Sequence, residues 1–195
     1  IQLICRDVDS PMLMKTIRRY GFTLKDQSYL SSYDCTEEIA QILIDKESST
    51  MQSCQGGQVL TLDEFKACDS DWKTKWYQFE QETVVDVPSE VPMEGLQFDD
   101  WETLVLGRVK SDTCLLFLVV NDRVVGPLNA LKSGAFYFIE FTGVAREYRR
   151  RGISSLLKVH LIRYAQAQGI ESIRTMNHHH TPMFQLNLQF GFKLL

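Results

Sequence analysis

Residues 137–168 read YFIEFTGVAREYRRRGISSLLKVHLIRYAQAQ and hold three different patterns in a row. The first belongs to an aromatic and apolar run, residues 136–141, which is typical of a buried strand. Four arginines and Gly152 come next. Apolar residues then recur at helical spacing, namely Leu156, Leu157, Leu161, Ile162 and Ala165. The stretch therefore predicts a strand, a basic glycine turn and a helix, in that order.

The predicted turn suits a phosphate group. The first turn of a helix carries unpaired backbone N–H groups and the positive end of the helix dipole. Gly152 leaves the backbone open to close approach, and the arginines raise the local positive potential. A pyrophosphate could dock here, although an ordinary solvated basic turn between a strand and a helix would look the same in sequence.

The turn also resembles a family signature. Residues 149–154 fit the pattern R-x-x-G-x-A/G, with Ser154 in place of the usual alanine or glycine. Between a strand and a helix this pattern marks the acetyl-CoA site of the GNAT superfamily of N-acetyltransferases, and the similarity covers roughly residues 55–195. It implies an α/β (α+β) fold with a mixed central sheet flanked by helices. It also implies transfer of an acetyl group from acetyl-CoA to a primary amine of a small molecule.

The resemblance assigns a coenzyme site. The backbone of residues 142–144 would pair with the pantetheine arm like an added strand, and residues 149–155 would hold the pyrophosphate. Asn177 and Asn187 complete the set. The predicted coenzyme-binding residues are Thr142, Gly143, Val144, Arg149, Arg150, Arg151, Gly152, Ile153, Ser154, Ser155, Asn177 and Asn187.

Glu140 is the predicted catalytic residue. It lies within the apolar run, where burial would raise the pKa of a carboxylate toward that of a useful base. Many GNAT enzymes place a base on this strand, working directly or through water. A strand residue that points at solvent is the alternative, and the sequence does not decide between the two.

The acid expected from the resemblance is missing. Many GNAT enzymes carry a tyrosine four residues before the Gly-Phe pair, where it protonates the departing thiolate, but this chain has Asn187 there. Another donor, such as solvent or a nearby histidine, could serve. The competing interpretation is a GNAT-fold module that binds an acyl-CoA or a protein partner without catalysing transfer.

No metal site is predicted. The three consecutive histidines at 178–180 point in alternating directions if the chain is extended, so they are poorly placed around one ion. A polar loop at the mouth of the cleft is the favoured interpretation.

The two ends of the chain resemble each other. Residues 1–24 and 173–195 both run from a strand through a polar loop to a short helix. Both carry a Pro-Met and a Gly-Phe pair, whose spacing agrees to within one residue: Pro11-Met12 with Gly21-Phe22, and Pro182-Met183 with Gly191-Phe192. Unless the similarity is chance, residues 1–50 are the partial first half and connector helix of a tandem GNAT protein, and 51–195 are its acetyltransferase domain.

Local patterns predict the remaining elements. A connector helix is expected from Thr36, with a polar boundary at 47–57. A short strand at 58–60 precedes helices over 71–83 and 98–108, the latter with Trp101, Leu104 and Val105 inward. A hairpin is expected over 114–131, with a bulge or a sheet edge at its proline.

The composition excludes some classes of binding partner for this chain. The net charge of −4 over 195 residues argues against a nucleic-acid binder, and no membrane-length apolar run is present. The five cysteines lack metal-type spacing and suit reduced thiols in a cytoplasmic protein. We therefore expect a cytoplasmic enzyme for a small-molecule amine, with a homodimer left open.

Overall fold

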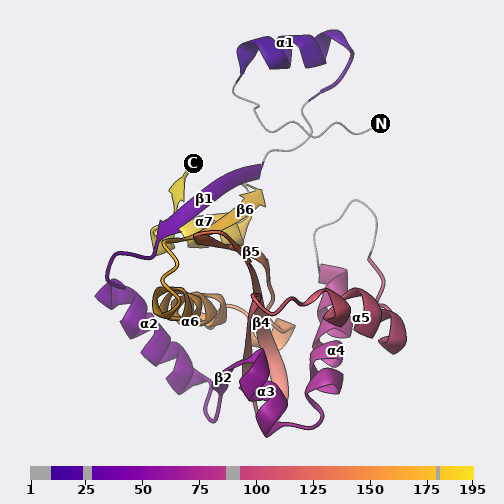
Figure 1. Cartoon of the computed structure of the whole chain (residues 1–195), viewed down its shortest axis with the longest axis vertical. Coiled ribbons are helices and arrows are strands. Elements are labelled where there is room, and N and C mark those ends of the chain that lie inside the picture. Colours follow the sequence, from indigo (N-terminus) through magenta and orange to yellow (C-terminus); the bar gives the residue numbers. More distant parts are fainter. Residues whose placement is uncertain (1–9, 24–27, 87–92, 179–180) are drawn as a thin grey trace.

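The computed structural model describes residues 10–23, 28–86, 93–178 and 181–195 (Figure 1). The helices are α1 (Pro11–Arg19), α2 (Gln41–Ser53), α3 (Leu62–Cys68), α4 (Trp72–Thr83), α5 (Phe98–Leu104), α6 (Ile153–Ala167) and α7 (Pro182–Phe190). The strands are β1 (Ser28–Asp34), β2 (Gln58–Thr61), β3 (Cys114–Val120), β4 (Arg123–Ser133), β5 (Phe136–Thr142), β6 (Ser172–His178) and β7 (Lys193–Leu194). Short 3-10 turns are η1 (Val84–Asp86), η2 (Leu106–Arg108) and η3 (Arg146–Tyr148).

The strands form one mixed sheet in the order β2-β3-β4-β5-β6-β1-β7. Strands β5 and β6 are parallel, as a strand–helix–strand crossover through α6 requires. The other described pairs are antiparallel. The predicted α/β fold with a mixed sheet and flanking helices is confirmed.

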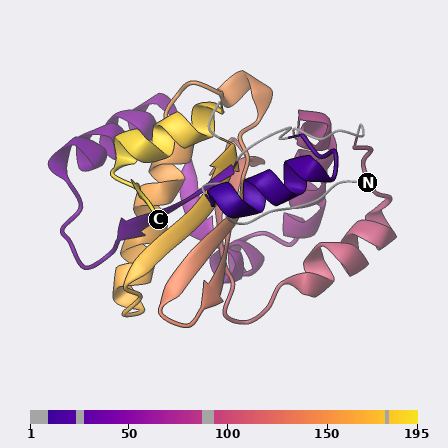
Figure 2. The ribbon, with the colours of Figure 1, turned by 90° about the horizontal axis from the view of Figure 1, so that it is seen from above.

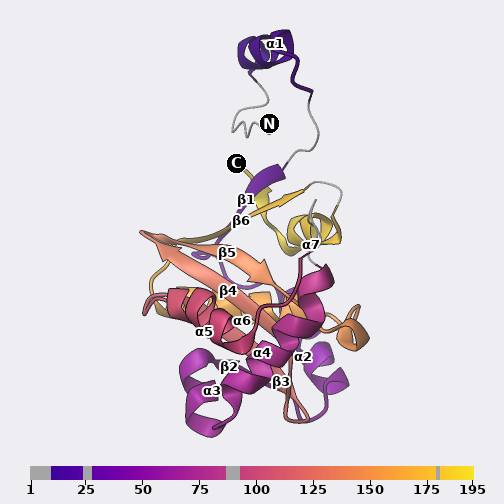
Figure 3. The ribbon, with the colours of Figure 1, turned by 90° about the vertical axis from the view of Figure 1, so that its right-hand side faces the viewer.

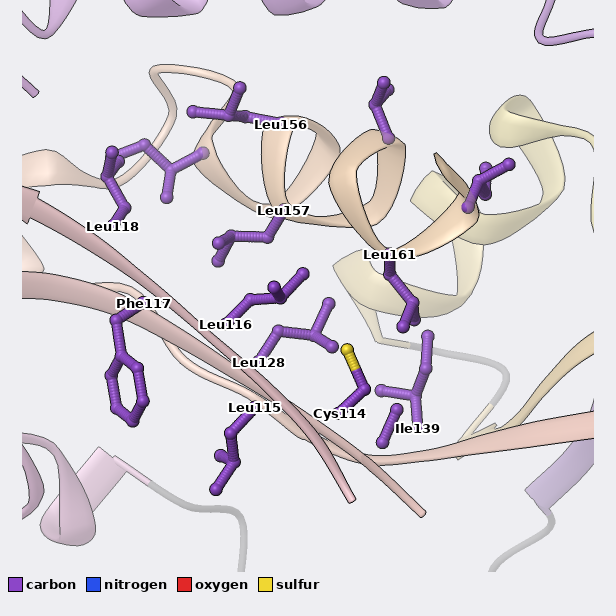
Figure 4. Packing of buried hydrophobic residues seen from close by; sticks show 14 of the residues in the cluster. Cys114, Leu115, Leu116, Phe117, Leu118, Leu128, Ile139, Leu156, Leu157 and Leu161 are labelled. Atoms are coloured by element: carbon purple, nitrogen blue, oxygen red, sulfur yellow. The ribbon is translucent and has the colours of Figure 1, made fainter. Parts of the chain in front are cut away.

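Helix α6 covers one face of the sheet and supplies much of the core. Figure 4 shows Leu116 and Leu128 pointing from the sheet toward Leu157 of α6, and all three side chains are fully or almost fully buried. Figure 2 shows α2 and α7 on this same side of the sheet. The apolar residues that predicted a buried helix thus face the sheet, as their spacing requires.

Helices α4 and α5 cover the opposite face (Figure 3). Leu115 and Phe117 point to this side, away from α6 (Figure 4). Trp76 of α4 packs on Phe117 and on Trp101 of α5, with ring centroids 5.2 Å apart in both pairs. The aromatic residues of the two helices are therefore core, the commoner role of an aromatic stripe.

The hairpin of β3 and β4 is confirmed. Asn121 and Asp122 form its turn with φ of 48° and 65°, values that a two-residue hairpin turn favours. Pro127 pairs opposite Phe117 in an interior strand, so the expectation of a sheet edge is wrong. The alternative, a bulge, holds, because the register of β4 shifts against both β3 and β5.

The connector helix begins later than predicted. Asp34 Oδ1 accepts hydrogen bonds from the N–H of Thr36 at 2.8 Å and from its hydroxyl at 2.6 Å. Thr36 therefore closes a turn at the end of β1 and does not cap a helix. Helix α2 starts at Gln41 and continues to Ser53, so most of the predicted polar boundary at 47–57 is helical.

Helix α5 ends earlier than predicted. Trp101 is buried as expected, but Leu104 is 42% exposed, which contradicts its inward placement. Because α5 ends at Leu104, the next two residues make the packing contacts: Val105, just before η2, and Leu106, its first residue, are both partly buried against the core. The predicted short strand at 58–60 is confirmed as β2. Helix α3 follows it directly, and Thr61 and Glu64 form a reciprocal capping box at its start.

Elements from the first fifty residues join the same sheet. Strand β1 pairs along its whole length with β6 and at its centre with β7. Helix α2 is tied to α6, because Glu47 accepts from Arg163 and lies 3.1 Å from Nε2 of His160. A boundary at residue 50 stays a prediction, and it does not separate two sheets in the described part.

Helices α1 and α7 have matching ends. At the start of each helix, the residue before the proline caps the helix with its hydroxyl side chain: Ser10 in α1 and Thr181 in α7. At the end of each helix, the backbone N–H of the phenylalanine in the Gly-Phe pair donates back to a helix carbonyl. Phe22 donates to Ile17 at 3.3 Å, and Phe192 donates to Asn187 at 3.0 Å. Within the described part α1 buries no residue, and Figures 1 and 3 show it standing apart from the sheet. The strand expected before α1 falls on residues 1–9, outside the described residues, so the duplication stays a prediction.

Candidate functional site

Strands β5 and β6 pair only over their first halves. The parallel pairing ends at Ile139 and Thr175, whereas β5 continues to Thr142 and β6 to His178. Just after β5, the N–H of Gly143 donates to the carbonyl oxygen of Pro127 in β4 at 3.1 Å. Since β5 stays bonded to β4, its edge toward β6 is left open at this end. An extended ligand could add hydrogen bonds to that edge as another strand would.

The basic turn starts α6 with two residues in the left-handed region. Arg150 has a φ of 61° and Gly152 a φ of 85°. The N–H of Leu156 donates to the carbonyl of Gly152 at 2.9 Å and begins the helical ladder. The amides of residues 150–155 donate to no group in the described part of the chain. Ile153 is buried, so it can offer a ligand only its backbone. Free amides of this kind are what the predicted anion site requires, and the binding of an anion there stays a prediction.

Gly152 is required by packing as well as by its backbone angle. A Cβ built on it would lie 2.4 Å from Oγ1 of Thr50 in α2. The prediction from sequence assigned this glycine to close approach of a phosphate, and α2 occupies the direction in which its side chain would point. Substituting valine, the obvious test of coenzyme binding, would therefore also strain the fold.

Replacing Gly152 by alanine is expected to lower the free energy of unfolding by about 2 kcal/mol or more, from the left-handed φ and the Thr50 contact together. Urea denaturation measures it. Gly134→Ala is the matched control, because Gly134 has a φ of 61° and nothing within 4 Å of its Cβ position. Thr50→Ala should relieve part of the loss in a double variant. Equal losses in Gly152→Ala and Gly134→Ala would show that the Thr50 contact costs nothing.

Asp86 of η1 holds two of the four arginines. Its carboxylate accepts from Nε of Arg146 at 2.8 Å and from the Arg149 guanidinium. These hydrogen bonds, that of Arg146 first, hold the pKa of Asp86 well below its ordinary value. Nε of Arg149 also donates to the carbonyl of Val144 at 3.0 Å. Arg149 thus fixes the turn against the end of β5, a role that the sequence did not indicate.

Arg150 and Arg151 remain for an anionic ligand. Neither has a carboxylate within 4 Å among the described residues. The Arg151 guanidinium lies over the ring of Tyr148, 5.1 Å from the centroid, and both arginines are exposed. Their charge is therefore free to attract a phosphate in solution.

Buried polar atoms without partners line the open end of the strands. Asn187 of α7 is 1% exposed and donates from Nδ2 to Oδ1 of Asn177 in β6 at 2.7 Å. Its own Oδ1 has no partner in the described structure, and neither has the buried Oγ1 of Thr142. Such orphaned atoms are uncommon and call for a missing partner. Together with the free amides of residues 150–155, they fit a ligand with hydrogen-bonding groups along its length and a pyrophosphate at one end, as acetyl-CoA has.

Glu140 is the extra residue of a bulge in β5. Asn129 pairs with Phe141 and Ala130 pairs with Ile139, so Glu140 has no partner in the ladder. Its side chain is exposed, and Oε2 accepts from Nδ2 of Asn129 at 3.3 Å. Of the two alternatives that the sequence left open, the solvent-facing side chain is the one observed, because the bulge turns Glu140 out of the apolar run. The case for Glu140 rests on its position.

That position is on the α4 side of the sheet. Asn129, which bonds Glu140, lies opposite Leu115, and Leu115 points away from α6 (Figure 4). Thr142 lies opposite Leu128, which points toward α6. The open end of β5 therefore has a carboxylate on one face and the predicted coenzyme groups on the other. A reaction between partners that arrive from the two faces could take place across it.

Lys158 is a buried cation that the sequence analysis missed. It is 2% exposed on α6, and its Nζ donates to Sδ of Met183 in α7 at 3.2 Å. Burial lowers the pKa of this lysine to about 8. In the sequence, Lys158 stands directly after Leu157 in an otherwise apolar stretch of the helix. A solvent-exposed lysine could occupy the same position, so the sequence gives no sign of its burial.

The remaining sequence features add little to the site. His178 lies 3.1 Å from Oγ of Ser28, whereas His179 and His180 are outside the described residues. Within the described ranges no group of three or more metal-ligating side chains could hold an ion. The four described cysteines are free. None of the described helices is long and apolar enough to cross a membrane.

Solved structures share this fold. A GCN5-related N-acetyltransferase from Sphaerobacter thermophilus is 16% identical, with a TM-score of 0.66 over 96% of this chain and 54% of its own. A tandem GNAT protein from the clavulanic acid biosynthesis pathway is 14% identical, with a TM-score of 0.61 over 95% and 56%. A functionally unknown conserved protein from Staphylococcus epidermidis is 14% identical, with a TM-score of 0.61 over 100% and 65%. The chain thus spans between half and two thirds of their lengths.

Comparison with curated proteins gave no significant match. A family comparison matched residues 70–192, which run from the start of α4 to the end of α7 and include the open strands, the basic turn and α6. The match covers more than half of the chain, and it agrees with the signature at the turn. The chain belongs to the acetyltransferase (GNAT) family.

Proposed function

We propose that this chain transfers an acetyl group from acetyl-CoA to the primary amine of a small molecule. The observation that carries the proposal is the row of free amides at residues 150–155, placed beside the open edge of β5. Acetyl-CoA supplies the reactive thioester. The amides and Arg150 would hold its pyrophosphate, the edge at 142–144 its pantetheine arm, and Glu140 would take the proton of the amine on the other face.

A non-catalytic acyl-CoA-binding module is the second candidate. The observation that favours it is Asn187, which stands where a thiolate-protonating tyrosine is expected and already bonds Asn177. In the catalytic proposal, solvent protonates the departing thiolate in place of that tyrosine. Release of thiol in the presence of amines separates the two, because the binding module would hold acetyl-CoA without consuming it. A small amine as acceptor, no nucleic-acid or membrane partner, and a cytoplasmic location are further parts of our proposal.

Ser154→Asp is expected to weaken CoA binding at least tenfold, because a carboxylate in the first turn of α6 would repel the pyrophosphate. The same carboxylate is favourable at a helix start, so the thermal midpoint should not fall. Calorimetric titration with CoA measures the first effect and thermal unfolding the second.

Ser111→Asp is the charge-matched control, since Ser111 is exposed in the turn before β3. It should leave the affinity for CoA unchanged. If Ser154→Asp bound CoA as well as the unchanged protein, the pyrophosphate would not lie at this turn. If the unchanged protein bound no CoA at all, the proposed function would be wrong.

A further inference from the structure

A hollow of about 490 Å³ lies between α2 and the start of α6. Its volume is in the range of small-molecule sites. The lining from α2 is Ile42, Asp45, Lys46, Ser49 and Thr50, and that from the turn and α6 is Arg151, Gly152 and Ser155. The hollow therefore adjoins the predicted pyrophosphate site. Its other wall is α2, a helix that lies before the family match at residues 70–192.

Two residues with hydroxyl side chains line this hollow, are themselves largely buried, and have no partner for the hydroxyl group within the described part of the protein. Thr50 is 5% exposed and Ser155 is 6% exposed. Neither side chain forms a hydrogen bond to another described residue. A hydroxyl in such a place is a donor and an acceptor left for a ligand. It is an observation separate from the helix start, and it indicates a polar ligand in the hollow.

The charges of the hollow favour an anion. Lys46 is exposed and, like Arg151, has no carboxylate within 4 Å in the described ranges. The one acid in the lining, Asp45, accepts from Nε2 of Gln41 at 2.8 Å. The free amides at the start of α6 add to the positive potential. A phosphate group is the ligand that matches this set.

The wall formed by α2 is regular and held in place. Ile42, Lys46 and Ser49 follow at helical spacing and share one face. Thr50 lies beside Gly152 of the basic turn. Lys46 precedes Thr50 by one helical turn, so it lies about 6 Å further than Thr50 from the basic turn, measured along α2. The Glu47 contacts with α6 fix this distance. Ile42 is 63% exposed at the rim and offers an apolar surface.

We propose that this hollow binds the 3′-phosphorylated ADP end of the coenzyme, with Lys46 contacting the 3′-phosphate and Ile42 the adenine. The pyrophosphate would lie over residues 150–155, and the ribose would set the 3′-phosphate one helical turn away, beside Lys46. Ser49 and the hydroxyls of Thr50 and Ser155 would bond the phosphates or the ribose. This proposal rests on the proposed function, and it assigns part of the coenzyme site to a helix outside the family match.

CoA and dephospho-CoA, which differ only in the 3′-phosphate, test the proposal by calorimetric titration of the full chain. The unchanged protein should bind CoA about tenfold more tightly than dephospho-CoA. Lys46→Ala should weaken CoA binding by about that factor and leave dephospho-CoA binding unchanged. Lys46→Arg should restore the preference, and raising the salt concentration should reduce it.

Lys132→Ala is the control, because Lys132 is an exposed lysine at the far end of β4. It should leave both affinities unchanged. If the unchanged protein binds both ligands and Lys46→Ala alters neither, or weakens both equally, Lys46 does not contact the 3′-phosphate and the inference is wrong while the proposed function stands. If the unchanged protein binds neither ligand, both are wrong.

Discussion

Replacing Glu140 by glutamine is expected to lower kcat for acetyl transfer by a factor of about 10² to 10⁴, the usual contribution of a general base. An alkyl ammonium is mostly protonated at neutral pH, so some group must accept its proton before the nitrogen can attack a thioester. Glu140 is an exposed carboxylate in the bulge of β5, on the face away from α6. Glutamine keeps the shape and the contact with Asn129 while removing the basicity.

The pH dependence separates a base from a structural residue. If Glu140 is the base, the loss in Glu140→Gln should shrink as the pH rises, because more of the amine is already neutral. CoA affinity should stay nearly unchanged, since the pyrophosphate site is on the other face. Steady-state rates over a pH series and a CoA titration measure both. Glu171→Gln is the control and should behave as the unchanged protein, because Glu171 is an exposed glutamate just before β6.

A wild-type rate in Glu140→Gln across the pH series would exclude Glu140 as the base. The next carboxylate to test would be Glu80 on α4, the helix that covers the same face. It is half-buried, and burial raises its pKa even though Nε1 of Trp76 donates to it at 3.1 Å. A base from α4 would also place the acceptor amine further from β5.

Local sequence was enough to predict the centre of the fold. The strand, basic turn and helix over residues 137–168 were predicted because their hydrophobic periods differ and Gly152 separates them. The hairpin at 114–131 followed from Asn121-Asp122 between two apolar runs. These elements also contain most of the predicted coenzyme residues. The free amides of residues 150–155 are a consequence of that local order alone.

Contacts between distant residues could not be predicted in this way. Strand β1 enters the sheet between β6 and β7, and nothing within residues 28–34 specifies those neighbours. Asp86 pairs with Arg146, sixty positions away in the sequence, and no local pattern around Asp86 indicates that partner. The hollow beside the basic turn exists only because α2 packs on α6. Each of these features depends on tertiary packing, which periodicity does not encode.

Glu140 shows how a local rule fails at a candidate site. Alternation along a strand gave it buried aromatic neighbours, but the bulge adds one residue between the pairs at Ile139 and Phe141. The added residue breaks the two-residue period and points the carboxylate to solvent. Bulges are common beside active sites, where they redirect a side chain. The irregularity that decides between burial and exposure therefore also leaves Glu140 accessible to a substrate.

Replacing Lys158 by methionine is expected to raise the free energy of unfolding by about 3 kcal/mol at pH 7. Burial lowers the pKa of Lys158 from its usual 10.5 to about 8, a difference that corresponds to about 3 kcal/mol at 1.36 kcal/mol per unit. At pH 7 the lysine is charged in both states, and only the folded state bears the cost of desolvating it. Methionine has a similar length and no charge, so it should fill the space beside Met183 without that cost.

The sign of the pH dependence follows from proton binding. Between pH 8 and 10.5 the unfolded chain binds more protons at this residue than the folded one, so the stability of the unchanged protein rises with pH across that window. The penalty is fully present below pH 8 and is gone above about 10.5. The advantage of Lys158→Met should therefore be largest at neutral pH and should vanish near pH 10.5. Urea denaturation of both proteins at several pH values measures the difference.

The comparison uses the difference in unfolding free energy between the two proteins. Tyrosines and cysteines also titrate in this pH range, but they contribute equally to both proteins, so their contributions cancel. Lys132→Met, at an exposed lysine, is the control and should change stability by less than about 0.5 kcal/mol at any pH. A Lys158→Met protein no more stable than the unchanged one at pH 7 would contradict the prediction. It would mean that the Lys158 ammonium reaches water or an anion in solution, and that the space between α6 and α7 is not dry.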